Sequence, residues 1–185
     1  MKSKNRTGLL IVYTGDGKGK TTAALGAVFR ALGHGWKVAI IQFVKGDWPI
    51  TCGEEESAKK FSKNGQLLFV QKGAGFVGIM GDKKPRAVHI GAAKKALKFA
   101  ESIIRDPSYD LVVLDEINGA VELGLLEIPE VLKTLSGRPE PNSIIVTGRN
   151  AAPEIIQIAD LVTEMREIKH PFRKRKIPAQ FGIDF

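Results

Sequence analysis

The feature that most constrains this chain is an apolar run followed at once by a glycine-rich turn and a helix-forming segment. The run is Leu9–Tyr13, the turn spans residues 14–19, and residues 20–32 are rich in alanine and leucine. A continuous apolar run is typical of a strand that is buried on both faces of a parallel sheet. The order of strand, turn and helix therefore predicts an α/β unit with a phosphate-binding loop.

This turn, Thr14-Gly-Asp-Gly-Lys-Gly-Lys-Thr-Thr22, supplies the groups that hold phosphate. Glycine N–H groups can approach phosphate oxygens closely, and a helix N-terminus adds partial positive charge. Lys20 supplies a full charge, and Thr21 offers a hydroxyl to Mg²⁺. Thr14 departs from the common pattern Gly-x-x-x-x-Gly-Lys-[Ser/Thr], which begins with glycine. The residues predicted to bind nucleotide here are Gly15, Asp16, Gly17, Lys18, Gly19, Lys20, Thr21 and Thr22.

Downstream, apolar runs alternate with helix-forming segments. Further strands are predicted at residues 37–43, 67–71, 110–114, 143–146 and 161–165, and helices at 54–63, 86–105, 128–135 and 153–159. Residues 72–85 contain four glycines and are expected to form a long loop, and long loops are often functional. The pattern predicts one doubly wound α/β domain over residues 1–185, P-loop NTPase-like, with a mainly parallel sheet. A short basic N-terminal segment and an irregular tail from Lys169 are expected to flank it.

Two acids, Asp115 and Glu116, end the strand predicted at 110–114. In P-loop proteins an acid at the end of a nearby strand holds Mg²⁺ directly or through water. We therefore predict Thr21, Asp115 and Glu116 as ligands of Mg²⁺, with Mn²⁺ as an alternative ion. The sequence leaves open how the acids divide this work. There are two alternatives: Asp115 merely caps the next helix, or Glu116 activates water, as in an ATPase.

Lys45 and Arg149 also follow strand ends, where doubly wound folds bind ligands. We predict that they contact phosphate; solvated surface charge is the alternative.

The composition limits the classes of partner. The net charge is +8, with much of the excess at the two ends, which suits a protein that binds polyphosphate. No basic pattern interleaved with aromatic residues is present, so we expect no specific nucleic-acid partner. No apolar run approaches the roughly 18 residues that a membrane span needs, so no membrane association is expected. The single cysteine, Cys52, excludes an internal disulfide and favours the reducing cytoplasm.

A set of short motifs runs in order along nearly the whole chain. They are Gly15-Asp-Gly-Lys-Gly-Lys-Thr-Thr-Ala-Ala24, Arg30-Ala-x-Gly-His-Gly35, Gln42-Phe-Val-Lys-Gly46, Gly53-Glu54, Val113-Leu-Asp-Glu116, Thr147-Gly-Arg149, Ala159-Asp160, Lys169-His-Pro-Phe172 and Ala179-Gln-x-Gly-Ile-Asp184. Each motif is weak alone, but the ordered set is specific. In this set the chain resembles the P-loop ATP:corrinoid adenosyltransferases of cobalamin biosynthesis and corrinoid salvage.

The resemblance implies a reaction. A corrinoid cobalt reduced to Co(I) attacks C5′ of ATP and releases tripolyphosphate, so no protein nucleophile is needed. Lys20, Thr21 and Glu116 are then the expected catalytic residues, because they act with Mg²⁺ on the charge of the leaving group. The resemblance further implies ATP and a reduced corrinoid as substrates, a reductant such as a flavoprotein, and a homodimer.

Gly75-Phe76 is similar to a Gly-Phe-x-Trp segment of this family, whose aromatic residues are thought to displace the lower axial ligand of cobalt. The resemblance therefore implies that Phe76 contacts the corrinoid. Gly78 stands where the tryptophan would be. The alternatives are that Phe76 acts alone, that another residue substitutes for the tryptophan, or that reduction of the cobalt is assisted in a different way.

Two other functions stay open at this point. One is a P-loop ATPase or kinase that uses Glu116 to position a nucleophile. The other is a nucleotide- or corrinoid-binding protein without turnover. The leaving group separates these functions, because only adenosyl transfer releases tripolyphosphate.

Overall fold

A computed structural model of the protein describes residues 6–46, 51–79 and 81–185. Within these residues, six strands form one sheet in the order β3-β2-β4-β5-β1-β6, and every neighbouring pair is parallel. The sequence prediction of a mainly parallel sheet is therefore confirmed. The strands are β1 (Leu10–Thr14), β2 (Val38–Gln42), β3 (Leu67–Gln71), β4 (Leu111–Asp115), β5 (Ser143–Thr147) and β6 (Leu161–Glu164).

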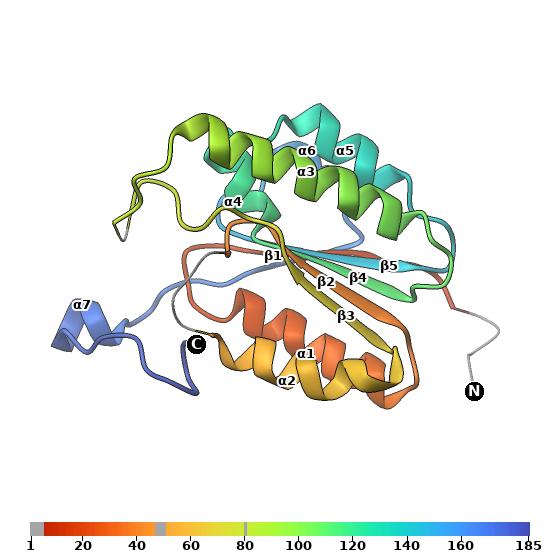
Figure 1. Cartoon of the computed structure of the whole chain (residues 1–185), viewed down its shortest axis with the longest axis horizontal. Helices are drawn as coiled ribbons and strands as arrows, with labels where there is room; N and C mark the ends of the chain where they lie inside the picture. Colours follow the sequence, from red (N-terminus) through yellow and green to blue (C-terminus); the bar gives the residue numbers. More distant parts are fainter. Residues whose placement is uncertain (1–5, 47–50, 80) are drawn as a thin grey trace.

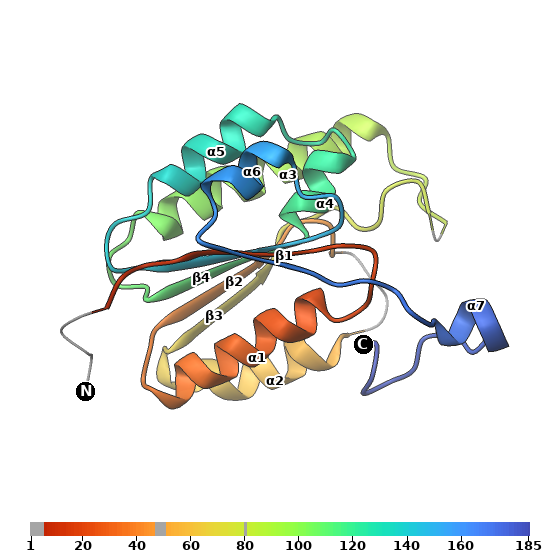
Figure 2. The same cartoon turned by 180° about the vertical axis from the view of Figure 1, so that it is seen from behind.

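Helices cover both faces of the sheet, as a doubly wound fold requires (Figures 1 and 2). One face carries α1 (Lys20–Gly33) and α2 (Gly53–Phe61), which a short 3₁₀ turn, η1 (Ser62–Asn64), continues. The other face carries α3 (Arg86–Ile104), α4 (Ile117–Glu122), α5 (Ile128–Ser136) and α6 (Pro153–Ile158).

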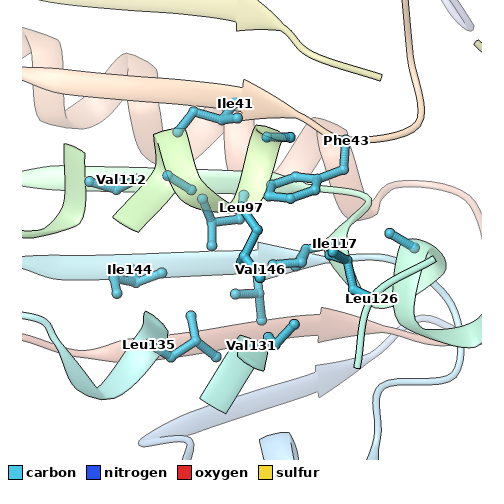
Figure 3. Packing of buried hydrophobic residues seen from close by; sticks show 14 of the residues in the cluster. Ile41, Phe43, Leu97, Val112, Ile117, Leu126, Val131, Leu135, Ile144 and Val146 are labelled. Carbon is cyan, nitrogen blue, oxygen red and sulfur yellow. The ribbon is translucent and has the colours of Figure 1, made fainter. Parts of the chain in front are cut away.

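The core consists of two apolar layers, one on each face of the sheet. In β4, Val112 belongs to the layer under α3 and α5, whereas Val113 belongs to the layer over α1. Figure 3 shows the first layer, in which Leu97 of α3 and Val131 of α5 approach the strands. Each such side chain stabilises the fold by about 1.5–3 kcal/mol when it is fully buried. Burial on both faces explains why these strands are continuous apolar runs.

The strand order brings the candidate residues to one edge of the sheet. The connection after β1 crosses by α1 to β2, whereas the connection after β5 crosses the opposite face by α6 to β6. Such a reversal opens a crevice at the carboxyl ends of the strands, where ligands bind in open α/β sheets. The phosphate loop after β1, the acids at the end of β4 and Arg149 after β5 all lie at this edge.

Two helices in the described residues differ from the sequence prediction. Helix α4 was not expected, and α7 (Pro171–Arg175) lies within the tail that was predicted to be irregular from Lys169, so that prediction is wrong for these residues. Both are only five or six residues long, too short to show a helical period. Helix α4 also contains Asn118-Gly119, an ordinary turn sequence, and it is held in place by burial of Ile117.

Of the basic N-terminal segment, only Arg6 lies within the described residues. Its guanidinium forms an ion pair with Asp110 at 3.1 Å and lies 4.2 Å from the ring centroid of Trp36. Residues 1–5 of this segment lie outside the described residues.

Candidate active site at the phosphate loop

The phosphate loop packs against the segment that follows β6. The N–H of Gly17 donates to the carbonyl oxygen of Met165 at 2.7 Å. A Cβ atom at Gly15 or Gly17 would lie 2.5 or 2.7 Å from this same oxygen. Gly15 also has a φ of 95°, which favours glycine. Packing against Met165 therefore requires glycine at both positions, and the N–H of Gly17 points to Met165.

Lys20 is buried at the start of α1, and the loop itself fixes its position. Its ammonium donates to the carbonyl oxygens of Gly15 at 2.7 Å and Gly17 at 2.8 Å. Burial lowers the pKa of Lys20, and the nearby Arg149 lowers it further, while the carboxylate of Glu116 opposes the shift. The loop therefore holds the ammonium of Lys20 in a fixed position.

Asp115 is buried at the end of β4, where four protein groups surround its carboxylate. Its Oδ1 accepts hydrogen bonds from the hydroxyls of Thr21 at 2.8 Å and Thr147 at 2.7 Å. Its Oδ2 accepts from the amide of Gln42 at 2.9 Å and lies 3.5 Å from the ammonium of Lys45. Asp115 thus ties α1 to the ends of β2 and β5, and its main contact with the phosphate loop is the Thr21 hydroxyl.

Sequence reasoning assigned no role to Gln42, Gln71 or Thr147, which complete this network. Gln42 is fully buried, and its side-chain oxygen accepts from the amide of Gln71 at 2.9 Å. The parallel register places Gln42 beside both Gln71 and Asp115. All three missed residues are the last of their strands. A polar residue closing an apolar run is the pattern that could have identified them.

Glu116 occupies a different environment from Asp115. Its φ is 63°, a left-handed conformation that turns the chain from β4 into α4. Its N–H donates to the hydroxyl of Thr147 at 2.9 Å, and neither acid makes a side-chain cap of α4. Burial raises the pKa of the Glu116 carboxyl, and the neighbouring Asp115 raises it further, although Lys20 and Lys45 oppose both effects. Because Glu116 and not Asp115 stands at the N-cap of α4, the interpretation of Asp115 as a helix cap is wrong.

Lys45 joins the carboxylate cluster instead of lying free at the surface. Its ammonium pairs with Glu54 at 3.1 Å as well as with Asp115. Burial alone lowers the pKa of Lys45, but the charges of Asp115 and Glu54 together raise it above its ordinary value. Arg149 is exposed, yet its charge is close enough to act on Lys20 and Glu116.

A cavity of about 740 Å³ opens beside this cluster. That volume lies within the range of small-molecule sites. Its polar end is formed by residues 18–22, Lys45 and Glu116, and its apolar end lies between α1 and α2, where Leu25 and Phe61 line it. Glu116 borders the cavity, whereas Asp115 lies behind it. Phe76 does not line this cavity; it lies in the loop between β3 and α3.

Comparison with known proteins shows the family of the chain. Residues 6–185 match the sequence model of the family described as ATP:corrinoid adenosyltransferase BtuR/CobO/CobP. The chain belongs to this family. The family name gives the two substrates, ATP and a corrinoid.

Individual relatives cover the whole chain. It is 41% identical to the corrinoid adenosyltransferase of Pseudomonas aeruginosa over 184 residues, which is 100% of this chain and 87% of that protein. It is 36% identical to the enzyme of the same name from Escherichia coli K12 and 35% identical to corrinoid adenosyltransferase CobA from Salmonella typhimurium, in each case over 100% of this chain and 89% of the relative.

Among solved structures, the flagellar accessory protein FlaH from Methanocaldococcus jannaschii is similar in fold. The TM-score is 0.52 at 14% identity, over 86% of this chain and 71% of that one. This likeness supports the α/β fold and nothing more. None of the helices in the described part of the chain is long and apolar enough to span a bilayer.

Proposed function

We propose that the protein transfers the 5′-deoxyadenosyl group of ATP to the Co(I) centre of a reduced corrinoid. The electron pair of Co(I) forms the Co–C5′ bond, the C5′–O bond breaks, and the pair from that bond leaves with tripolyphosphate, so cobalt becomes formally Co(III). The observation that carries this proposal is that Lys20, Thr21 and Glu116 meet at the polar end of one cavity in a chain of this family.

Lys20 supports the step by stabilising the leaving group. Negative charge builds on the phosphate oxygen as the C5′–O bond breaks, and a fixed charge in a buried site stabilises it without reorganisation. The two loop carbonyls that hold the Lys20 ammonium supply this fixed position. The other loop residues from Gly15 to Thr22, together with Lys45 and Arg149, are proposed to hold the rest of the polyphosphate.

The oxygen groups beside the loop fit Mg²⁺, which supplies further positive charge against the phosphates when bound. The Thr21 hydroxyl donates its hydrogen to Asp115, so its lone pairs remain for a cation. Glu116 faces the same cavity, and we propose that Asp115 acts by orienting Thr21 or through water. The described residues contain no group of three or more His, Cys, Asp or Glu able to hold a metal alone. Phosphate oxygens and water would complete the shell, as Mg²⁺ prefers.

For the corrinoid, we propose Phe76 as the main contact. It lies in the 72–85 loop, at the same edge of the sheet as the phosphate loop (Figure 1). Asp82 supports this loop, because its carboxylate accepts from the N–H groups of Gly78 at 2.9 Å and Lys84 at 3.0 Å. Gly78 has a φ of 68°, which a tryptophan adopts only with strain. The glycine therefore suits the loop as it is built here.

We further propose that the enzyme works in a reducing cytoplasm as a homodimer, with Mg²⁺, or Mn²⁺ in its place, and an external reductant such as a flavoprotein. Formation of Co(I) needs an electron donor, and the free, half-buried Cys52 thiol suits a reducing compartment. Apolar side chains on α6 and the edge strand β6 support a self-association surface, since Ile156, Ile158, Leu161 and Val162 are all exposed.

The test is an anaerobic assay with Mg-ATP and chemically reduced cobalamin, in which the absorbance of the new Co–C bond is followed. Lys20→Ala should lower the rate by roughly 10²–10³ because a preorganised charge is lost. Lys98→Ala removes the same charge from an exposed position on α3 and should leave the rate unchanged. A Lys20→Ala rate within twofold of the unmodified protein would defeat the assignment.

A further inference from the structure

The C-terminal tail forms part of the wall of the substrate cavity. After α7 the chain turns back toward the first turns of α1 and α2 (Figure 2). Residues 182–185 line the same cavity as residues 18–22 of the phosphate loop. The main chain of Phe185 also lies against Gly53, the first residue of α2. The last four residues therefore bridge the two helices that border the cavity.

The end of this tail is a defined turn. The N–H of Asp184 donates to the carbonyl of Gln180, and its Oδ2 accepts from the N–H of Gln180, both at 2.8 Å. The N–H of Gly182 donates to the carbonyl of Phe185 at 2.9 Å. The rings of Phe181 and Phe185 pack edge to face with centroids 4.6 Å apart. These contacts fix the direction in which the Asp184 carboxylate points.

That carboxylate points at the phosphate loop. Its Oδ1 lies 2.7 Å from the ammonium of Lys18, which also donates to the carbonyl of Ile183 at 3.1 Å. The hydrogen bond from Lys18 holds the pKa of Asp184 below its ordinary value, and the N–H of Gln180 adds to this effect. The side chains keep 45% and 27% of their surface exposed, so the pair is accessible to a competing anion.

We propose that Asp184 is an internal counter-anion that competes with polyphosphate for Lys18 and so promotes release of tripolyphosphate. This inference rests on the proposed function, in which the loop holds a polyanion. Tripolyphosphate and the Asp184 carboxylate repel each other, and both attract the same ammonium. Exposed ion pairs are weak, so an entering polyphosphate can displace Asp184. After transfer, the carboxylate is available to recover Lys18 as the product leaves.

The test is calorimetric titration of the full chain with tripolyphosphate in the presence of Mg²⁺. Asp184→Asn removes the charge and retains an oxygen for the N–H of Gln180. Its Kd for tripolyphosphate should be about twofold to fivefold lower than that of the unmodified protein. Asp106→Asn makes the same change at a half-buried residue whose partner is Ser108, outside the cavity, and should leave Kd unchanged.

A second variant checks that the effect passes through Lys18. In a Lys18→Met background, Asp184→Asn should change Kd by less than twofold, because the shared ammonium is gone. Equal or weaker binding of tripolyphosphate to Asp184→Asn than to the unmodified protein contradicts this inference alone. Absence of binding to both proteins contradicts the leaving-group assignment as well.

Discussion

Gly17→Ala tests the packing of the phosphate loop against the C-terminal half of the chain. Gly17 has no positive φ, so alanine can adopt its backbone conformation. The obstacle is steric: the new Cβ would lie 2.7 Å from the oxygen of Met165 and 2.8 Å from the carbonyl carbon of Arg166. Both are backbone atoms, so no side-chain rotation can relieve the contact. The loop must move away and lose the 2.7 Å hydrogen bond to Met165.

The expected loss of stability is the sum of the steric cost and the cost of the lost hydrogen bond. Overpacking costs about 1–3 kcal/mol and a lost hydrogen bond about 0.5–1.5 kcal/mol, so the free energy of unfolding should fall by about 2–4 kcal/mol. Urea denaturation measures this fall, and calorimetry with Mg-ATP should show weaker binding. Gly26→Ala is the matched control on α1, where a Cβ meets nothing within 4 Å. It should stabilise the protein by about 0.5–1 kcal/mol. The packing argument would be refuted if Gly17→Ala had an unchanged ATP affinity and a free energy of unfolding within about 0.5 kcal/mol of that of the unmodified protein.

Three further predictions concern the metal, the buried network and the corrinoid loop. Thr21→Val should lower turnover by roughly tenfold or more, because one ligand group of the metal is lost, and it should raise the Mg²⁺ concentration needed in a titration of activity. Full activity in excess chelator would contradict the metal site. Gln42→Leu removes one hydrogen-bond partner from the buried carboxylate of Asp115 and one from the amide of Gln71, and it should lower the free energy of unfolding in urea by about 1–3 kcal/mol. A change below about 0.5 kcal/mol would show that the network is dispensable. Phe76→Ala should abolish the four-coordinate species in spectra of Co(II) cobalamin bound with Mg-ATP. A stable variant that keeps this species and normal turnover would exclude Phe76 as a corrinoid contact.

The elements that sequence reasoning located well are those with strong local patterns. Helix α1 begins at Lys20 as predicted, because the glycine-rich turn before it fixes the start. Strand β3 matches its predicted bounds of Leu67 and Gln71, because an apolar run is set between turn residues. Helices α4 and α7 were missed because their few residues carry no period and depend on tertiary contacts or on Pro171 at the first position.

The residues of the candidate site likewise divide into those that a local pattern locates and those that depend on tertiary structure. Lys20 and Thr21 could be placed from their motif, but adjacency in sequence concealed the difference between Asp115 and Glu116. The left-handed φ of Glu116 directs one carboxylate into the protein and the other toward the cavity, and nothing local requires this conformation. Gln42 reaches Asp115 only through the strand register, which a single sequence does not specify.

The central claim is that the polyphosphate leaves intact, and the products of a single reaction test it most directly. ATP, Mg²⁺ and chemically reduced Co(I) cobalamin are mixed anaerobically with the protein, and phosphorus NMR and the optical spectrum are recorded together. One tripolyphosphate should form for each adenosylated corrinoid, with no ADP. Formation of ADP or inorganic phosphate in place of tripolyphosphate would contradict it and would indicate a P-loop ATPase or kinase.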